Sequence, residues 1–541
     1  RVRCRACVAL AKVALMHQSH RVTINPTGKL LTATLGLLEA KVPPSVHKWA
    51  VEAFMFLTIL PDTKVHLHEK KMGFGSLVAL SESVGKDSSF HYSIMSAFAR
   101  LCVEKEKSED QKNLEREMDK KQIEQMRQLQ AGGGGNAAPM EKEDDPALLR
   151  ALAKQLVADD AVLVIAELVQ HTNDAKSAGL RKQAAQVLQV MADTVESRGK
   201  MVQQGGYKAM LALTVVEDAK LVVNKDPLNA TQFAAAWGLA KVAISTNPAL
   251  YPRRTGSGPE GMIAPLLKLV DEGDNELMTF EGSMALCNLA TVPELRDKIV
   301  ALGGWRVLQM ALTSTNEMVQ RAVVETLSNL VTNDEIAAKF IDPECTDMKI
   351  FVSFACSEDP KTQIAAAGAL ATLADVPELA EAMVKGKALE PFTEMALLAE
   401  DPAILHRAAV GLRGMLINAT DLCVGEAGDD STPPEHALLC LGALTVLSRC
   451  GVEQAKKAAV EGLVSLRKLR PDVIIPPPEA VQHVVENMQA EQARREAEAE
   501  AARIEEEEAA AAEEAEAAAA EEAKKARAAA GEDMDDIDEG I

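Results

Sequence analysis

Aromatic residues are scarce in this chain of 541 residues, where they make up 3% of the sequence and include only three Trp. A core with so few aromatic rings has to be built mainly from Ala, Leu and Val, packed closely together. The sequence also lacks any run of 18 apolar residues and any signal-peptide pattern, which excludes a membrane-spanning helix. Its nine cysteines are odd in number and scattered, which excludes a disulfide framework. We therefore expect a soluble cytoplasmic protein that has no contact with membranes.

Positive charge is also in short supply, and the net charge is -22. The acidic excess is concentrated at the C-terminal end. Residues 479–530 contain 15 acidic and 6 basic residues, and residues 531–541 contain six acidic and no basic residues, so this tail carries -15 of the total. The remaining chain is close to neutral and offers no basic surface for nucleic acid. We therefore predict that nucleic acid is not a partner.

Motifs that carry enzyme chemistry are absent as well. We find no phosphate-binding Gly loop, no nucleophile elbow, no metal-protease His pair and no paired carboxylates in a suitable context. Cys4 and Cys7 have the spacing of zinc ligands, but no second pair accompanies them, and we predict that both pack in a helix core. The sequence thus predicts a protein without enzymatic activity, cofactor or metal.

What the sequence does contain is a helical pattern that occurs ten times. Each copy has a large apolar anchor, a small residue or Val just before it, and an apolar residue three positions after it. Five of the nine spacings between anchors lie between 41 and 44 residues, which is the period of repeats built from two or three helices. The anchors are Leu10, Phe54, Phe98, Leu188, Leu239, Leu286, Leu327, Leu370, Leu412 and Leu444.

The order of helices within a repeat favours one repeat type. We expect helices at 293–302, 305–312 and 317–331, which is a short, medium, long order, with Gly303 and Gly304 at the turn between the first two. Three helices per repeat with a long third helix is the armadillo arrangement. The predicted fold is therefore an all-α, right-handed superhelical armadillo solenoid, in which each repeat is stabilised by its neighbours.

Composition divides the chain into four parts. Residues 1–103 contain three anchors, and because the first helix already has the pattern of a third helix, we expect earlier repeats to be missing. A charged, Gly-rich flexible insert follows at 104–145. Residues 146–475 form the main array of seven anchors. In 476–541 we expect a capping helix over 479–490, an Ala/Glu-rich helix and a disordered acidic end.

The candidate binding residues lie next to the buried stripe of the third helices, two positions before or after an anchor. Armadillo third helices line the concave surface, so these positions predict a ladder of side chains along one groove. Asn both donates and accepts hydrogen bonds and can hold an extended peptide, while Trp offers a flat apolar platform. The alternative is that the Asn side chains bond neighbouring helices and that the Trp is part of the core. The predicted groove residues are Trp237, Lys241, Asn288, Asn329 and Thr372.

Several runs resemble a known family. They are ESRG at 196–199, VQQGG at 202–206, LAKVAI at 239–244, MALCNLA at 284–290, AAAGALA at 365–371 and, upstream, KWAVEA at 48–53. Together they resemble the UCS-domain myosin chaperones over roughly residues 1–420. The resemblance implies an armadillo superhelix whose UCS part binds the myosin motor domain and assists its folding and assembly.

The resemblance also bears on a second partner. Animal members of the family carry an N-terminal TPR domain that recruits the ninety-kilodalton heat-shock chaperone. No TPR pattern occurs in this sequence, so this partnership is expected only for a longer protein that includes such a domain. The alternative function is an armadillo adaptor of the nuclear-import or cytoskeletal scaffold kind. Import adaptors need Trp and Asn pairs over several repeats and a basic arm, whereas this chain has one such Trp and an acidic tail.

Overall fold

The fold is entirely helical in the part of the chain that the computed structural model describes, where no strand occurs. Its helices form two compact units, Arg1–Ile336 and Ala337–Ile541. No helix in this described part is long and apolar enough to cross a membrane. The structure describes residues 2–16, 18–84, 88–105, 144–171, 177–214, 227–251, 258–272, 275–342, 346–425, 435–490, 493–494, 497–498 and 501–504.

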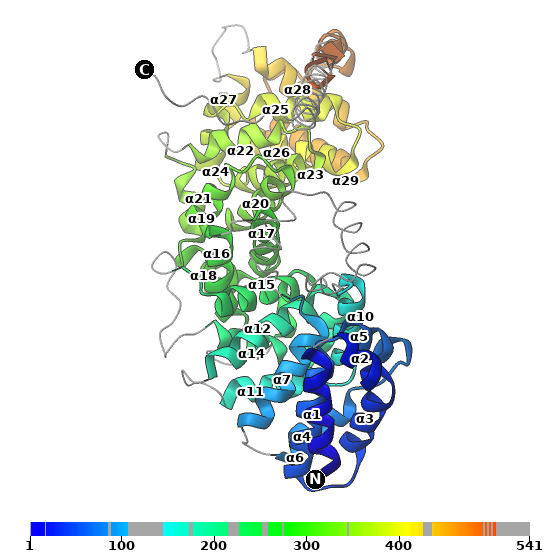
Figure 1. The fold of residues 1–541 in the computed structure, drawn as a ribbon. Coiled ribbons are helices and arrows are strands. Elements are labelled where there is room, and N and C mark those ends of the chain that lie inside the picture. Colours follow the sequence, from blue (N-terminus) through cyan, green and yellow to red (C-terminus); the bar gives the residue numbers. More distant parts are fainter. Residues whose placement is uncertain are drawn as a thin grey trace, which may run out of the picture. The chain divides into compact units, whose positions relative to one another are not determined.

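The first unit consists of successive helices that form three-helix repeats along most of its length (Figure 1). Its N-terminal helices are α1 (Val2–Met16), α2 (Gln18–Ile24), η1 (Pro26–Leu30), α3 (Leu31–Glu39), α4 (Pro44–Leu57), α5 (Pro61–Glu69), α6 (Gly75–Val84) and α7 (Ser88–Cys102). Further along the chain are α10 (Pro146–Ala158), α11 (Ala161–His171), α12 (Ala178–Asp193), α13 (Val195–Gln203), α14 (Gly206–Leu213), α15 (Ala230–Ser245), η3 (Pro248–Leu250), η4 (Pro259–Met262), α16 (Ile263–Asp271), α17 (Glu276–Ala290), α18 (Pro293–Ala301), α19 (Gly304–Ala311) and α20 (Glu317–Leu330). The helix α21 (Asp334–Lys339) begins at the C-terminal end of the first unit.

Local sequence signals explain where these helices begin and end. The N-cap Asn229 accepts hydrogen bonds from the backbone of Thr231 and Gln232, and together with the Gln232 side chain it forms a capping box at the start of α15. Proline occupies the first turn of α18, where no backbone donor is needed. Gly303 has φ of 80°, a left-handed conformation that favours glycine, and it separates α18 from α19 as predicted.

The long third helices carry the anchors and pack against one another along the first unit, in the order α4, α7, α12, α15, α17 and α20. The anchors on these helices are almost completely buried. A small residue before the anchor permits this close approach: a Cβ on Gly238 would lie 2.6 Å from Met210 Sδ and 3.2 Å from Gln189 Cα. Thr326, in the same position on α20, donates a hydrogen bond of 2.9 Å to the Ser283 carbonyl. The predicted all-α, armadillo-like solenoid is therefore the fold that forms.

The first predicted anchor is wrong. Leu10 is 43% exposed, whereas α1 buries a different stripe, which includes Cys4, Cys7, Val8 and Ala11 and packs against α4. Both stripes satisfy the helical period, so the sequence pattern alone does not distinguish them. The two cysteines are core residues, as predicted.

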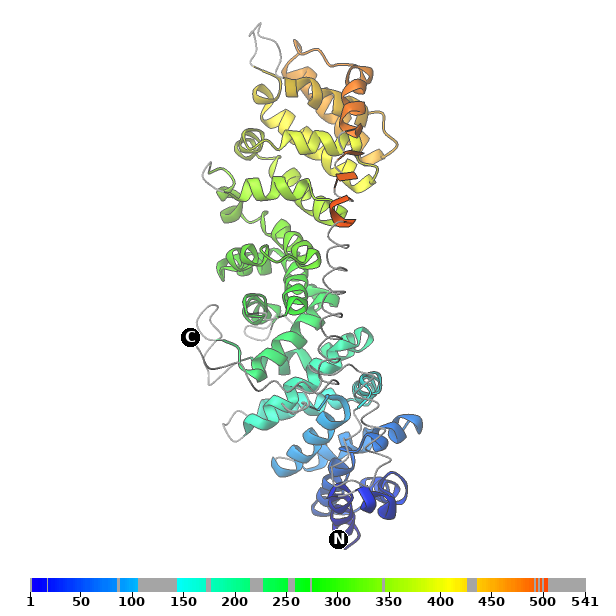
Figure 2. The ribbon, with the colours of Figure 1, turned by 45° about the horizontal axis from the view of Figure 1, so that its top comes forward.

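The second unit repeats this arrangement (Figure 2). Its helices are α22 (Asp347–Ala355), α23 (Pro360–Leu373), α24 (Pro377–Lys385), α25 (Leu389–Leu398), α26 (Pro402–Asn418), α27 (Thr420–Val424), α28 (Glu435–Leu447), α29 (Glu453–Leu469) and η5 (Pro478–Val481). The third-helix stack consists of α23, α26 and α29. Leu444 is buried, but it lies on α28, which packs mainly against the middle helix α25. The last predicted anchor therefore belongs to a middle helix, and α29 takes the position of the third helix.

The two predicted blocks 1–103 and 146–475 are in direct contact, because α7 packs against both α10 and α12. Lys64 on α5 forms a buried ion pair with Asp144, and Gln155 on α10 donates a hydrogen bond of 2.7 Å to the Met72 carbonyl. The array thus continues past the insert. Most of the predicted insert, 106–143, lies outside the described residues.

The predicted capping helix over 479–490 corresponds to η5 and a helical segment that continues to residue 490. Val481 is fully buried against α28, and a Cβ on Gly442 would lie 2.1 Å from Val481 Cγ1. Val484, Val485 and Met488 are half-buried and continue the same apolar face. Residues 505–541, which include most of the predicted Ala/Glu-rich helix and the predicted acidic end, lie outside the described residues.

Candidate functional site

Three of the five predicted groove residues lie close together on the third helices α15 and α17, and two of them take part in a network of charges. We call this network the Lys241 cluster; it consists of Asp193 at the end of α12, Arg198 on α13, Trp237 and Lys241 on α15, and Glu281 on α17. Lys241 and Trp237 are four residues apart and therefore lie on the same side of their helix. Successive third helices are neighbours, so the cluster joins three repeats of the first unit.

Lys241 is the centre of this cluster. Its Nζ atom lies 3.0 Å from Asp193 Oδ1 and 3.1 Å from Glu281 Oε2, and it lies above the Trp237 ring, 4.7 Å from the ring centroid. Trp237 Nε1 donates a hydrogen bond to the Glu281 carboxylate. The Lys241 side chain is only 8% exposed. Its cation is therefore largely shielded from water where it pairs with two carboxylates and an aromatic face.

Arg198 adds a second cation to the cluster. Its Nε atom donates to the Ala192 carbonyl at 2.8 Å, and its Nη1 atom donates to Ser245 Oγ at 3.2 Å. Burial lowers the pKa of the Arg198 guanidinium, and the nearby negative charges of Glu281 and Asp193 oppose that shift. Two cations and two carboxylates therefore balance one another, as buried charges require.

The two predicted asparagines form bonds between repeats. Asn288 Nδ2 donates to the carbonyls of Ala243 at 2.7 Å and Thr246 at 2.9 Å, both at the C-terminal end of the preceding third helix. Asn329 Nδ2 donates to the Cys287 carbonyl at 3.1 Å. Helix C-termini leave carbonyls without intrahelical partners, and these amide groups satisfy some of them. The alternative in which the Asn side chains bond neighbouring helices is therefore the arrangement observed, and both side chains are half-buried.

The predicted positions differ in their exposure. Lys241 is buried, not exposed as a groove position would be, because the acids that surround it come from neighbouring repeats. Trp237 is half-buried: its ring contacts Lys241 on one side and meets Phe233 edge to face at 6.2 Å. Thr372, in the second unit, is exposed, and its hydroxyl donates to the Gly368 carbonyl of its own helix at 2.9 Å.

Sequence analysis missed three members of the cluster, namely Asp193, Arg198 and Glu281. A signal for two of them was present in the sequence. Arg198 and Glu281 each lie about one repeat away from Lys241, and Arg198 is part of the run ESRG that carries the family resemblance. No group of three or more His, Cys, Asp or Glu side chains in the described part of the chain is arranged to hold a metal ion.

A similar but exposed arrangement occurs near the N-terminus of the same unit. Lys12 on α1 pairs with Glu52 at 2.9 Å and lies 4.8 Å from the centroid of the Phe56 ring. Arg100 on α7 approaches the same ring, at 5.8 Å, and donates to the Met55 carbonyl at 2.6 Å. Arg100, two positions after the anchor Phe98, thus bonds the preceding repeat, as Asn288 and Asn329 do, whereas Lys12 bonds the following one.

Comparison with known proteins shows what the chain is similar to, although no family model matches it. It is 26% identical over 382 residues to "Protein unc-45 homolog B" of Xenopus tropicalis, which covers 69% of this chain and 38% of that protein. The chain therefore spans less than two fifths of the length of this curated relative.

Solved structures share the fold. UNC-45 from Drosophila melanogaster matches with a TM-score of 0.64 and 23% identity, over 87% of this chain and 56% of that one. The myosin chaperone UNC-45 from C. elegans, solved in complex with an Hsp70 peptide, matches with a TM-score of 0.65 and 18% identity, over 85% and 45% of the two chains. The resemblance to the UCS-domain family, predicted from the sequence, is confirmed by these homologues and by the armadillo-like fold they share with this chain.

Proposed function

We propose that this chain is the myosin-binding part of a co-chaperone, which assists folding and assembly of the myosin motor domain without any enzymatic activity of its own. The observation that carries the proposal is homology over 382 residues to an unc-45 protein, joined with the fold of a structure described as a myosin chaperone. Within the chain, we assign this role to the armadillo array of residues 146–475, and we propose that it acts in the cytoplasm.

In the first unit, the proposed binding surface is the face of the third helices next to the anchors, with Trp237, Lys241, Asn288 and Asn329. In the second unit, taken by itself, it is the same face of the third helices, with Thr372. Because each asparagine uses its Nδ2 group to bond the preceding repeat, we assign hydrogen bonding with the client to the amide oxygens. The half-buried ring of Trp237 supplies apolar contact area. Lys241 and Glu281 contribute mainly by holding the Trp237 ring in position.

We propose the ninety-kilodalton heat-shock chaperone as a further partner only for a longer protein that carries a TPR domain. Support for it comes from C. elegans UNC-45, which has been solved with an Hsp90 peptide and with an Hsp70 peptide.

Binding of a purified myosin motor domain to the full chain tests the proposal, together with protection of the motor from thermal aggregation measured by light scattering. The sharpest variant is Thr372→Arg, which puts a long charged side chain on the proposed face without disturbing the core. We expect it to raise the Kd at least tenfold. Its matched control is Ser353→Arg, which adds the same charge at an exposed position on α22, outside the third helices. Equal binding by both variants and wild type would mean that the motor does not use the third-helix face.

The double variant Asn288→Ala with Asn329→Ala tests the first unit. It removes the bonds to the preceding repeat, so we expect a loss of about 1 kcal/mol of stability per hydrogen bond in addition to weaker motor binding. Binding is therefore measured at a temperature where circular dichroism shows the variant fully folded. A folded double variant that binds and protects the motor like wild type would leave these residues with a structural role only.

A further inference from the structure

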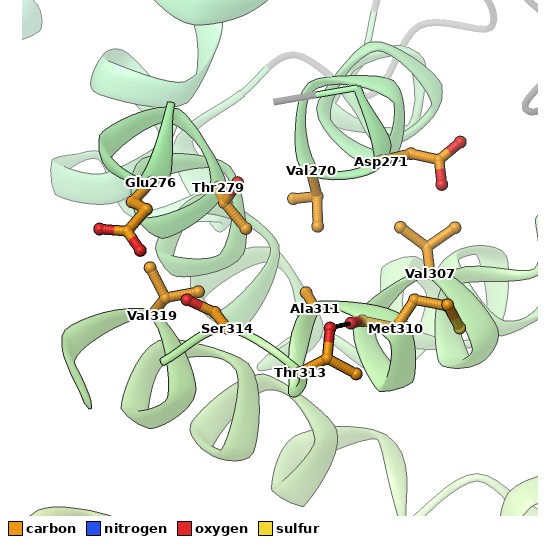
Figure 3. A pocket seen from close by; sticks show the side chains of 10 residues that line it. All are labelled: Val270, Asp271, Glu276, Thr279, Val307, Met310, Ala311, Thr313, Ser314 and Val319. Carbon is orange, nitrogen blue, oxygen red and sulfur yellow. Dashed lines mark hydrogen bonds between the residues drawn. The ribbon is translucent and has the colours of Figure 1, made fainter. Parts of the chain in front are cut away.

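A small cavity lies in the first unit, on a part of α17 that the Lys241 cluster does not use. It has a volume of about 260 Å³ and lies where the end of α16 and the start of α17 meet the end of α19 and the start of α20. Figure 3 shows the side chains of Val270, Val307, Ala311 and Val319 around its centre. This floor is aliphatic, and its volume lies below the range typical of drug-sized ligands. The cavity is therefore matched to one or two aliphatic side chains.

The rim of the cavity is acidic. Asp271 and Glu276 stand on opposite sides of it (Figure 3), and both residues are exposed. The ten lining residues include no basic side chain. The C-terminal ends of α16 and α19 and the N-terminal ends of α17 and α20 meet at this place, so their partial charges largely offset one another and the two carboxylates determine the sign of the potential. Together these features give the cavity a negative potential around an apolar centre.

One large apolar side chain of the cavity wall faces solvent. Met310, which lines the cavity, is 62% exposed. An exposed methionine at the mouth of an apolar cavity gives a partner additional apolar surface to cover. Methionine, being flexible, adapts its shape to what it contacts.

This surface is distinct from the proposed motor-binding face. On α17 the cavity is lined by Glu276 and Thr279, whereas the Lys241 cluster uses Glu281. Residues two positions apart on an α-helix point roughly 200° apart. Thr279 and Glu281 therefore face nearly opposite sides of the helix, and a partner in the cavity leaves the other face open.

We infer that this cavity is a second peptide-binding site, which takes a basic polypeptide segment that inserts one aliphatic side chain between Val270 and Val319. Lys or Arg residues on either side of the inserted residue pair with Asp271 and Glu276. Charge complementarity selects this partner, because an acidic segment would meet two carboxylates and no basic side chain among the lining residues. The aliphatic floor selects an apolar residue at the centre. A polar side chain there would lose its hydrogen bonds to water and find few hydrogen-bond partners in the cavity.

The test uses the full chain and two fluorescein-labelled peptides, GGKKLKKGG and GGKKSKKGG, with binding followed by fluorescence anisotropy at low ionic strength. We expect the Leu peptide to bind and the Ser peptide to bind at least tenfold more weakly. The double variant Asp271→Lys with Glu276→Lys should weaken binding of the Leu peptide at least tenfold. Both positions are exposed, so the fold should survive, which thermal denaturation checks.

The matched control is Glu294→Lys with Glu335→Lys, which changes the net charge by the same amount at two exposed positions that do not line the cavity. We expect this control to bind the Leu peptide within about twofold of wild type. An equal loss in both double variants would assign binding to the general negative charge of the chain and overturn the inference. Equal affinity for the two peptides, or no binding of the Leu peptide, would overturn it as well.

Discussion

Lys241 and Lys12 provide a comparison of the same interaction in two surroundings. Each Nζ atom lies about 3 Å from a glutamate carboxylate, 3.1 Å for Lys241 and 2.9 Å for Lys12, and each cation lies over an aromatic ring at 4.7 and 4.8 Å. The Lys241 side chain is 8% exposed and that of Lys12 is 50% exposed. Replacing each lysine by methionine keeps the apolar stem and removes the charge, so the two variants differ in burial and in the second carboxylate, Asp193, that pairs with Lys241.

We expect Lys241→Met to lower the free energy of unfolding by about 2 to 3 kcal/mol. Breaking a buried ion pair removes roughly 3 to 5 kcal/mol, because the partner is left unpaired. Two observations place the loss for Lys241→Met at or below the lower end of this energy range. Asp193 is 31% exposed, and Arg198 remains as a second cation near both carboxylates. Exposed pairs contribute only about 0.2 to 1 kcal/mol, so Lys12→Met should lower stability by less than about 1 kcal/mol.

Urea unfolding of the full chain, followed by far-ultraviolet circular dichroism at 25 °C, measures both losses. In thermal denaturation the first unit, Arg1–Ile336, has an unfolding entropy of roughly 0.7 kcal/mol/K at about 2.1 cal/mol/K per residue. The expected drop in Tm is then about 3 to 4 °C for Lys241→Met and about 1 °C for Lys12→Met. In 1 M NaCl the effect of Lys12→Met should nearly vanish and that of Lys241→Met should persist, because salt screens exposed charges far more than buried ones. Equal losses for the two variants, or equal sensitivity to salt, would refute the argument from burial.

Two further predictions concern the core. Leu370→Asp puts a carboxylate into a fully buried anchor position and should lower the free energy of unfolding by several kcal/mol. Thr372→Asp, at an exposed position on the same helix, should change it by less than about 0.5 kcal/mol. Equal urea midpoints for the two variants would refute the repeat register. Burial raises the pKa of Cys102 and of Cys423 to about 12 from the ordinary value of 9.0. The stability that each neutral thiol contributes is therefore complete below pH 9 and is lost as the pH rises towards 12. Each thiol lowers the free energy of unfolding by about 1.4 kcal/mol per pH unit in this range. Unfolding free energies measured from pH 7 to 11 should fall above pH 9, and Cys102→Ala should flatten that slope; an unchanged slope would contradict the assignment.

The helices could be predicted from the sequence because their signals are local. The expected segments 293–302, 305–312 and 317–331 correspond to α18, α19 and α20 within one residue at each end. Glycine with positive φ, proline in the first turn and the period of the apolar residues act within a few residues of the place they determine. The family resemblance required only matching runs, and the homologues confirmed it.

The errors in the fold arose where a pattern has more than one solution. On α1 the stripe through Leu10 and the stripe through Ala11 both have helical spacing, and only contact with α4 decides which is buried. Leu444 has all the properties of an anchor, but α28 packs against a middle helix and α29 completes the stack. Periodicity predicts that a helix has a buried side, and the partner of that side is decided by the neighbouring repeats.

The candidate site was harder to predict because its contacts join residues about one repeat apart. Lys241 meets Glu281, 40 positions later, and the Asn288 amide reaches a carbonyl 45 positions earlier. The sequence pattern places these residues next to the buried stripe, but it does not say which way a long side chain turns. The spacing of one repeat between opposite charges is the signal that would have identified Glu281 as the partner of Lys241.

These inter-repeat bonds bear on how a client could use the third-helix face. Asn288, Asn329 and Lys241 already bond neighbouring repeats, so replacing any of them changes both the stability of the array and the surface it presents. A loss of motor binding in such variants is ambiguous unless the folded fraction is measured. Among the described residues, Thr372 bonds its own helix and no neighbouring repeat, and it is exposed, so a change there alters mainly the surface. Exposed positions beside the bonded residues are therefore the ones that separate client recognition from the packing of repeats.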